Sequence, residues 1–339
     1  MEAVGLSIVE NIREAGAIIV YNGEEISTSL AGHTGSFTYN DPDSGESDDI
    51  TLTVNDPDDK WIGSMFPKLG DRIMARIFVR DWRFQGDNRM LDCGSFVVDD
   101  PGFSGPPTKV DFKAVSQPAD TDFTSRERTQ TWENVTVQNM ASEIAGRYAL
   151  VIQYTADEVK IESMEQSGQT DSDFLKSVCD KYELGLKVYS SRLVIYDKQK
   201  YRDAPPVATI DKGQMTQWSY KTKLAGTYTG GDMQYTDPTS GEDREAKVGT
   251  EQRLLHVSGK ADSQADAEKQ IKAAVNKANE EMTTLSVRIP GNPDLCSTQC
   301  VLITGLKTAD GKYYIKKATH SIGGKYETAL EMSKVEPSI

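Results

Sequence analysis

The chain has 339 residues, of which 37% are hydrophobic and 27% are charged. This composition is typical of a folded globular protein, and the length favours roughly two to three domains of about 100 to 150 residues each. Acidic residues outnumber basic ones by 52 to 38, and the net charge of −14 argues against stable nucleic-acid binding. The start of the chain shows neither the ~20 apolar residues of a membrane helix nor a signal-peptide pattern, so we expect synthesis in the cytosol and no membrane insertion.

The first third of the sequence is typical of a β-rich domain. Strand-like segments begin at Ala17 and are separated by turn signals, the first of them at Asn22-Gly23. Residues 41–46 are acidic, contain Pro and Gly, and are interpreted as a solvated turn. Further strands are predicted at residues 50–54, 73–79 and 96–98. We assign residues 1–116 to a first β domain.

Helix and strand signals alternate in close order only between residues 132 and 197. Apolar residues at helical spacing predict a helix over residues 135–148, with Thr136 as its N-cap. A second helix is predicted to open at Thr170, with Asp173 as the partner in a capping box. No glycine-rich phosphate loop and no nucleophile elbow occurs in this stretch, so it is interpreted as a folding unit without visible chemistry.

The rest of this middle stretch is predicted to be a hairpin. Gly185 stands where the second helix needs a left-handed C-cap, and the two strands that follow turn at Ser190-Ser191. Residues 117–131 are polar enough to be a connection. We therefore assign residues 117–200 to an α/β domain that lies between two β regions.

Residues 201–339 are predicted to form a second β domain. Its longest helix is expected over residues 263–282, with Ser263 and Asp266 as the capping signal, and it interrupts the β region. Strands are predicted at residues 285–289, 301–304, 313–322 and 326–332, the last two as a hairpin. The fold class is therefore α+β and mainly β.

One turn sequence occurs twice. The pattern Tyr-x-Asp-Pro-x-Ser-Gly-Glu is found at residues 39–46 and again at residues 235–242. The flanking residues match poorly, and a match of eight residues in a turn is short enough to arise by chance. The repeat is a hint that the two β regions share a hairpin, and it leaves open whether they are a true duplication.

Four cysteines are candidates for metal ligands or disulfide partners. Cys93, Cys179, Cys296 and Cys300 do not form a spaced framework, so reduced thiols are expected. Cys296 and Cys300 lie near Asp294, and His320 could approach them in the fold. A structural zinc site normally needs four ligands, and no second pair is present in the sequence, so we predict no metal site and leave open whether these two cysteines have a role.

The remaining candidates for chemistry are also weak. The acidic stretch 41–49 resembles a calcium loop, but its glycine is fifth rather than sixth and position twelve is Leu52 instead of glutamate. The three histidines, His33, His256 and His320, do not lie beside a nucleophile motif. We predict no catalytic, cofactor-binding or metal-binding residues, no cofactor and no enzymatic activity.

Several stretches in a fixed order carry a resemblance to a known family. They are Ile50-Thr51-Leu52-Thr53-Val54-Asn55-Asp56-Pro57 with Trp61; Gly70-Asp71-Arg72-Ile73; Leu91-Asp92-Cys93-Gly94-Ser95-Phe96-Val97-Val98-Asp99; Asp173-Phe174-Leu175 with Tyr182; and the final hairpin, from Tyr313-Tyr314-Ile315-Lys316-Lys317-Ala318-Thr319-His320 through Tyr326-Glu327-Thr328-Ala329-Leu330. In this order the chain resembles the phage late-control protein D family, the baseplate hub proteins of contractile phage tails and related injection systems. The resemblance spans nearly the whole chain.

The resemblance implies a homotrimer in which each subunit supplies two tail-tube-like antiparallel β-barrels. Three subunits would then present six barrels to the sixfold tail tube and a threefold face to the central spike. The implied partners are the tail tube protein, the spike protein and other baseplate proteins, in a virion or tail-like particle assembled in the host cytoplasm. The repeated turn would mark corresponding hairpins of the two barrels.

Two other functions stay open at the level of sequence. The first is a cell-wall or glycan-binding tail component that uses the unit between residues 132 and 197. The second is a hydrolase of the same machine, such as a peptidase or muramidase, which the sequence supports least. Neither the kind of particle nor the surface that faces the lumen follows from the sequence.

Overall fold

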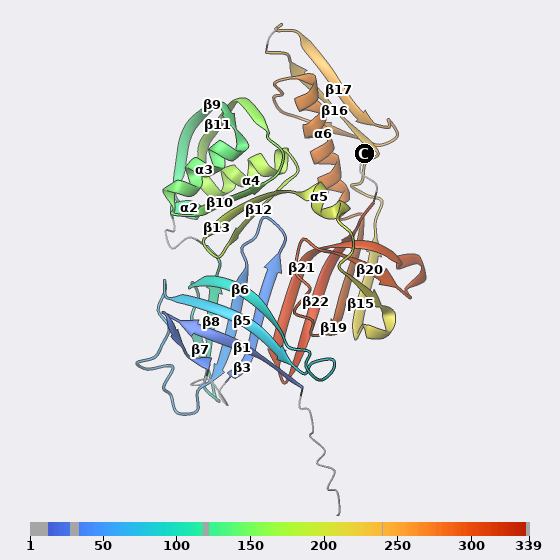
Figure 1. The fold of residues 1–339 in the computed structure, drawn as a ribbon. Helices are drawn as coiled ribbons and strands as arrows, with labels where there is room; N and C mark the ends of the chain where they lie inside the picture. The colour runs from blue at the N-terminus through green and yellow to red at the C-terminus, as the bar shows by residue number, and fades with distance from the viewer. Residues whose placement is uncertain (1–12, 28–33, 118–121, 239, 337–339) are drawn as a thin grey trace, which may run out of the picture.

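Most of the chain folds into β-strands, as expected. The computed structural model describes residues 13–27, 34–117, 122–238 and 240–336. Figure 1 shows a lower platform built from the first and last parts of the chain, with two further units above it. The α+β, mainly β class is confirmed. No helix in these described ranges is long and apolar enough to cross a membrane.

The first β region forms one half of the platform. Its strands alternate in burial, so that Ile73, Ala75, Ile77 and Val79 of one strand point into the core and their neighbours point outward. Six strands of this region supply most of the apolar side chains of the core, which explains why the alternating pattern predicted them; Trp61 and Tyr326 complete it. The strands are β1 (Glu14–Tyr21), β2 (Glu24–Glu25), β3 (Thr34–Pro42), β4 (Asp49–Asn55), β5 (Arg72–Arg80), β6 (Arg89–Val98), β7 (Gly102–Ser104) and β8 (Lys109–Val115).

The C-terminal β region forms the other half of the platform and has its own apolar core. The predicted final hairpin is β21–β22, which pairs from Tyr313 opposite Lys334 to Gly323 opposite Lys325. The strands are β14 (Ala208–Asp211), β15 (Gln217–Thr222), β19 (Thr283–Pro290), β20 (Cys300–Thr304), β21 (Gly311–Gly323) and β22 (Lys325–Lys334). Two short 3-10 helices, η1 (Lys212–Gln214) and η2 (Lys307–Ala309), connect them.

A single sheet runs through both β regions. β21 pairs antiparallel with β3, from Lys317 opposite Pro42 to Ile322 opposite Phe37. The main path of the sheet is β15-β19-β22-β21-β3-β4-β8-β6-β5-β1-β2, with β7, β14 and β20 paired beside it. Over the ranges that the structure describes, this path does not return to its first strand. The two β regions are therefore one continuous platform rather than separate bodies.

The middle domain contains both predicted helices. They are α3 (Val137–Arg147) and α4 (Asp171–Lys181), and the hydroxyls of Thr136 and Thr170 cap them as expected. The predicted hairpin is β12–β13, with both turn residues, Ser190 and Ser191, at positive φ. The other elements are α2 (Asp122–Ser125), β9 (Glu127–Thr136), β10 (Val151–Thr155), β11 (Lys160–Thr170), β12 (Leu184–Tyr189), β13 (Arg192–Asp197) and α5 (Lys198–Asp203).

Two local predictions in this domain are wrong. Residues 127–131 belong to β9, which pairs with β11. All five side chains are polar and none is fully buried, so the sequence shows no apolar alternation there. The left-handed residue after α4 is Glu183, with φ of 57°, and not Gly185. Gly185 lies inside β12, where a Cβ would come within 2.1 Å of the Tyr196 ring. The glycine therefore makes room for an aromatic side chain instead of ending a helix.

The long predicted helix belongs to a small α/β unit. α6 (Gln264–Asn279) is capped by Ser263 and packs on a three-stranded sheet of β16 (Gly230–Thr236), β17 (Asp243–Gly249) and β18 (Leu254–Val257). This unit has its own apolar core. It lies beside the middle domain above the platform (Figure 1), and Lys277 and Asp180 form an ion pair of 2.8 Å between the two.

The repeated turn does not mark equivalent hairpins. Its first copy, residues 39–46, covers the end of β3 and the loop toward β4, in the platform. Its second copy, residues 235–242, covers the end of β16 and the turn toward β17, in the small α/β unit. The expectation that the two turns mark corresponding hairpins is therefore wrong, because the strands beside them join different sheets.

Candidate functional site: the junction of the platform and the middle domain

A largely enclosed lysine lies at the centre of the contact between the middle domain and the platform. Lys187 of β12 points toward the acidic stretch that begins at the end of β3, where its ammonium pairs with Asp41 and lies 2.8 Å from Oδ1 of Asp48. It also donates a hydrogen bond of 3.0 Å to the carbonyl of Pro42. Both carboxylates are almost fully buried, and only 12% of the lysine side chain is exposed. We call this cluster of Lys187, Asp41 and Asp48 the seat.

The C-terminal β region completes the seat. Ser297 donates from its backbone N–H to Oδ2 of Asp41 at 2.7 Å and from its hydroxyl to Oδ1 at 2.8 Å. The hydroxyl of Tyr39 donates to Oδ2 of Asp48 at 2.8 Å. The first β region, the C-terminal β region and the middle domain thus all contribute to one polar cluster.

The seat holds two carboxylates against one ammonium. Burial raises the pKa of Asp48 to about 7, although the Lys187 ammonium acts in the opposite direction. Burial by itself lowers the pKa of Lys187, but Asp41 and Asp48 outweigh it, so the lysine pKa is raised. With Asp48 ionised, the cluster carries one uncompensated negative charge away from water.

Hydrogen bonds around the seat fix the hairpin on the acidic stretch. The hydroxyl of Tyr196 donates to the carbonyl of Asp43 at 2.7 Å. The N–H of Gly45 donates to the carbonyl of Leu186 at 3.2 Å, and the N–H of Leu186 donates to the hydroxyl of Ser44 at 3.2 Å. These contacts involve the loop that the sequence suggested was a solvated turn.

That interpretation of the acidic stretch is wrong. Asp41, Asp43 and Asp48 are all buried, with exposed fractions of 7% or less. Lys187 occupies the place between Asp41 and Asp48 that a cation would take. The stretch looked solvated because its neutralising lysine lies 146 residues away in the sequence.

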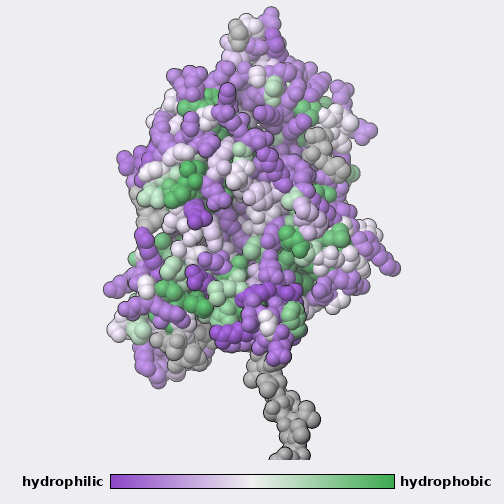
Figure 2. Space-filling view, viewed as in Figure 1, coloured by the Kyte–Doolittle hydropathy of each residue, from purple (hydrophilic) through white to green (hydrophobic). Residues whose placement is uncertain are grey.

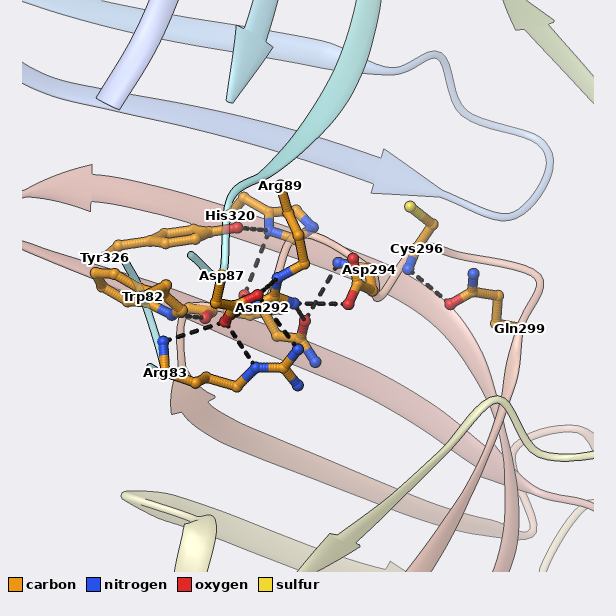
Figure 3. A network of polar contacts seen from close by, with 12 residues as sticks. Trp82, Arg83, Asp87, Arg89, Asn292, Asp294, Cys296, Gln299, His320 and Tyr326 are labelled. Carbon is orange, nitrogen blue, oxygen red and sulfur yellow. Dashed lines mark hydrogen bonds and ion pairs between the residues drawn. The ribbon is translucent and has the colours of Figure 1, made fainter. Parts of the chain in front are cut away.

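A second polar cluster lies where the two β regions meet (Figure 3). Arg89 of β6 forms an ion pair of 2.6 Å with Asp294 and donates a hydrogen bond of 2.8 Å to Asn292. Arg89 also pairs with the buried Asp87 at 2.9 Å. The indole N–H of Trp82 donates to the carbonyl of Gly291 at 2.6 Å. We call these contacts, together with the β3–β21 ladder, the seam.

His320 is buried in the seam in one defined tautomer. Its Nε2 lies 3.0 Å from the carbonyl of Leu295, which can only accept, so Nε2 carries the proton. Its Nδ1 therefore accepts a hydrogen bond from the hydroxyl of Tyr326 at 2.8 Å. Burial lowers the pKa of His320 to about 4, so the imidazole is neutral at physiological pH. The residue fills a structural position on β21, as its alternation with strand residues suggested.

The residues that the sequence offered as ligands make other contacts. Cys300 is buried and its thiol faces the carbonyls of Tyr201 and Arg202, while the backbone N–H of Cys296 donates to Gln299 near the seam. His256 pairs with Asp232 on the small α/β unit, and His33 lies outside the described residues. In the described part of the chain, no three His, Cys, Asp or Glu side chains gather as a metal site would require.

Sequence reasoning missed the residues that hold the junction. Lys187 sits in the strand pattern Leu-Lys-Val-Tyr, where an outward lysine is ordinary. Arg89 and Asn292 are likewise unremarkable in strand and turn sequence. The one available signal was the density of aspartates between residues 41 and 49, which required a buried cation if the stretch was not solvated.

The comparison with family models decides the class of the protein. Residues 103–326, more than half of the chain, match the model described as phage tail baseplate hub (GPD). The chain belongs to this baseplate hub family. The matched range starts in β7 and ends in β22, so it includes the middle domain, the small α/β unit and most of the C-terminal β region. Among the curated proteins, none matches the sequence.

Solved structures share the fold at low sequence identity. A tail protein from Neisseria meningitidis aligns with a TM-score of 0.72 and 13% identity, over 94% of this chain and 96% of that one. A 43 kDa tail protein of prophage MuSo2 from Shewanella oneidensis gives a TM-score of 0.72 and 11% identity, over 95% and 99%. An E. coli protein described as a component of the type VI secretion system, structurally similar to the T4 tail proteins gp27 and gp5, gives 0.57 and 12%, over 89% and 73%.

These comparisons agree on a structural component of a phage-tail-like particle. The matches to the two tail proteins extend over nearly the full length of all three chains, so the four-part arrangement of two β regions, middle domain and small α/β unit is a property of the fold. In the present chain the seat and the seam are polar contacts that join the two β regions and the middle domain.

Proposed function

We propose that the protein is a homotrimeric baseplate hub that joins the sixfold tail tube to the threefold central spike. The observation that carries this proposal is the baseplate hub match over residues 103–326. It is supported by the likeness to a type VI secretion component that itself resembles two T4 tail proteins, gp27 and gp5. The hub works through its surfaces and catalyses no reaction.

In this proposal each β region is the counterpart of one tail-tube-like barrel, so that three copies present six barrels to the tube. Residues 1–116 supply the first and residues 201–339 the second, with the middle domain, 117–200, braced between them. The continuous β3–β21 ladder supports the idea, because it fixes the angle between the two β regions within each copy. A ring built from such rigid pairs has a defined diameter, which a tube interface requires.

The oligomeric mass tests the proposal. Native mass spectrometry and light scattering of the purified chain should give three copies at micromolar concentration, because obligate interfaces of this kind bury large areas. The tail tube protein and the spike protein, added separately, should each bind the trimer. A chain that stays monomeric over a wide concentration range and is not drawn into a ring by either partner would contradict the proposal.

The particle itself gives an independent test. We expect the protein to be assembled in the host cytoplasm and to be found in the baseplate of purified tails together with other baseplate proteins. A pull-down on isolated cell wall separates this function from a glycan-binding tail component. Retention on cell wall without any association with tube or spike would favour the glycan-binding function instead.

A further inference from the structure

The two outer sides of the platform differ in charge and both expose large apolar side chains. One side is formed by the β4–β5 loop and the β7–β8 hairpin, residues 56–71 and 99–113, which contain seven aspartates and four lysines. Leu69 is 71% exposed and Phe103 is 62% exposed on this side. We call these two segments the acidic side. It lies to the left of the platform in Figure 1.

The opposite side carries the opposite charge. Residues 207–224 and 302–312, which contain β14, β15, the end of β20 and both 3-10 helices, hold five lysines and two aspartates. Trp218 is 45% exposed and Leu302 is 37% exposed here. We call these two segments the basic side. Figure 2 shows hydrophobic patches on both the left and the right of the lower half, within a mostly hydrophilic surface.

The basic side ends in an open strand. Among the described strands, β15 pairs only with β19. Trp218 lies opposite the buried Val287 and therefore belongs to the core face of the sheet, yet nearly half of its surface is exposed. Lys212 lies 5.3 Å from the centre of its ring. An indole on the core face at an unpaired edge is typical of a surface that a partner covers.

The acidic side is a rigid surface. The carboxylate of Asp56 accepts hydrogen bonds from the backbone N–H groups of Lys60, Trp61 and Ile62, which fixes the β4–β5 loop. The rings of Phe66 and Phe103 pack edge to face at 5.9 Å, which joins this loop to β7. The side is thus preorganised for docking and needs little ordering on contact.

A ring of identical copies needs two different patches on each copy. Rotational symmetry of order three makes each contact heterologous, so that one patch of a copy meets the other patch of its neighbour. The acidic and basic sides lie apart on the platform, have opposite charge and each combine that charge with apolar side chains. They meet the requirement for such a pair.

We propose that the acidic side of one copy docks on the basic side of the next, with Phe103 and Trp218 in the apolar centre of the contact. This inference rests on the proposed homotrimer and adds the surface that closes it. The partner is a second copy of this chain. Lysines on one side and aspartates on the other set the direction of the ring and disfavour contact between like sides.

Charge reversal on each side tests the docking. Lys221 and Lys223 are exposed, and so are Asp58 and Asp99, so K221E/K223E and D58K/D99K leave both cores intact. Each double variant should raise the dissociation constant of the trimer on the order of 100-fold, measured by native mass spectrometry across a dilution series. The combined four-residue variant restores opposite charges at every contact and should return to within about tenfold of the original chain.

Matched controls carry the same change of charge elsewhere. K269E/K272E on α6 and E133K/E165K on the β9–β11 ribbon alter exposed residues outside both sides and should stay trimeric. The inference is wrong if the side variants remain as trimeric as the original chain, if the controls dissociate equally, or if the combined variant does not recover. An original chain that is monomeric would instead refute the proposed homotrimer.

Discussion

The seam and the seat join parts of the same molecule in different ways. At the seam, β21 and β3 share a ladder of six residue pairs, and aromatic rings of Tyr39, His320 and Tyr326 pack against it. At the seat, the middle domain is held mainly by side chains, with Lys187 at the centre of the cluster. A backbone ladder distributes its stability over many groups, whereas the seat depends on one charge.

This difference predicts which part opens first. The platform should unfold as one cooperative unit, because its two cores share a sheet. The middle domain has a separate apolar core and is anchored through polar groups, so it should be able to detach from the platform while both remain folded. Substitutions at the seat, at the seam and on the exposed surface test that contrast.

Removing the seat lysine should cause the largest loss. Lys187→Met leaves Asp41 and Asp48 buried without their cation, which we expect to cost about 3 to 5 kcal/mol in the free energy of unfolding at pH 8. The deficit should shrink as the pH falls from 8 toward about 7, because loss of the lysine raises the pKa of Asp48 further and its protonation removes one of the two uncompensated charges. Chemical denaturation at several pH values measures both effects.

A matched lysine serves as the control for that variant. Lys176 is exposed and its ammonium contacts the carbonyl of Gly45 on the same acidic stretch at 3.3 Å. Lys176→Met should change the free energy of unfolding by less than about 1 kcal/mol. Equal losses in the two variants, or a loss at Lys187 that is the same at all pH values, would contradict the role given to the seat.

The seam should show the opposite dependence on pH. The folded pKa of His320, about 4, lies below the unfolded value near 6.5, so the unfolded state binds more protons between these values. Stability contributed by the neutral imidazole is therefore lost as the pH falls from about 6.5 to 4, by up to about 3 kcal/mol. Folding raises the pKa of Asp48 from 3.8 to about 7, so its protonation stabilises the folded state as the pH falls between these values, which is the opposite effect over an overlapping pH range.

Comparison with His320→Asn isolates the histidine, because the Asp48 contribution is common to both chains. The free energy of unfolding of the original chain minus that of the variant should decrease on acidification from pH 6.5 to 4. The asparagine side chain keeps an N–H donor for the Leu295 carbonyl, which accepts from His320 in the original chain, so the variant is expected to fold. A difference that stays constant over this range would show that His320 does not titrate in this way.

Two tyrosines give a matched comparison of single hydrogen bonds. Tyr196→Phe removes the bond to the Asp43 carbonyl at the seat and should cost about 1 to 1.5 kcal/mol. Tyr326→Phe removes the bond to His320 at the seam and should cost less, about 0.5 to 1 kcal/mol, because the Thr328 hydroxyl also lies 3.3 Å from Nδ1. Hydrogen exchange should rise in β12–β13 for the first variant only. Increased exchange along β3 and β21 in that variant would argue against a separate seat.

An exposed ion pair should contribute least. Arg80 and Glu14 lie 3.0 Å apart on adjacent strands, with 64% and 49% of their side chains exposed. Arg80→Gln should therefore change the free energy of unfolding by about 0.5 kcal/mol or less, and less still at high salt. Chemical denaturation at two salt concentrations measures this effect. A loss of stability comparable with that of Lys187→Met would mean that the buried and the exposed ion pairs contribute equally, whatever their burial.

Much of the local structure followed from short-range pattern. The caps at Thr136, Thr170 and Ser263 and the turn at Ser190-Ser191 were predictable because each depends on residues within a few positions along the chain. The prediction at Gly185 failed because its reason is tertiary, namely the Tyr196 ring packed over it. The strand of residues 127–131 was missed because an exposed ribbon has little apolar alternation.

Local sequence was enough to predict the mainly β class, most helix and strand positions and the likeness to baseplate hub proteins, since periodicity, capping and motif order are properties of neighbouring residues. The tertiary structure alone decided which polar groups meet. Asp41 and Ser297 are 256 residues apart, and Arg89 and Asn292 are 203 apart, yet both pairs form hydrogen bonds. Such contacts depend on how the sheet brings distant strands together, and no local pattern encodes that arrangement. Tertiary structure likewise forms the acidic and basic sides, because each brings together two separate segments of the chain.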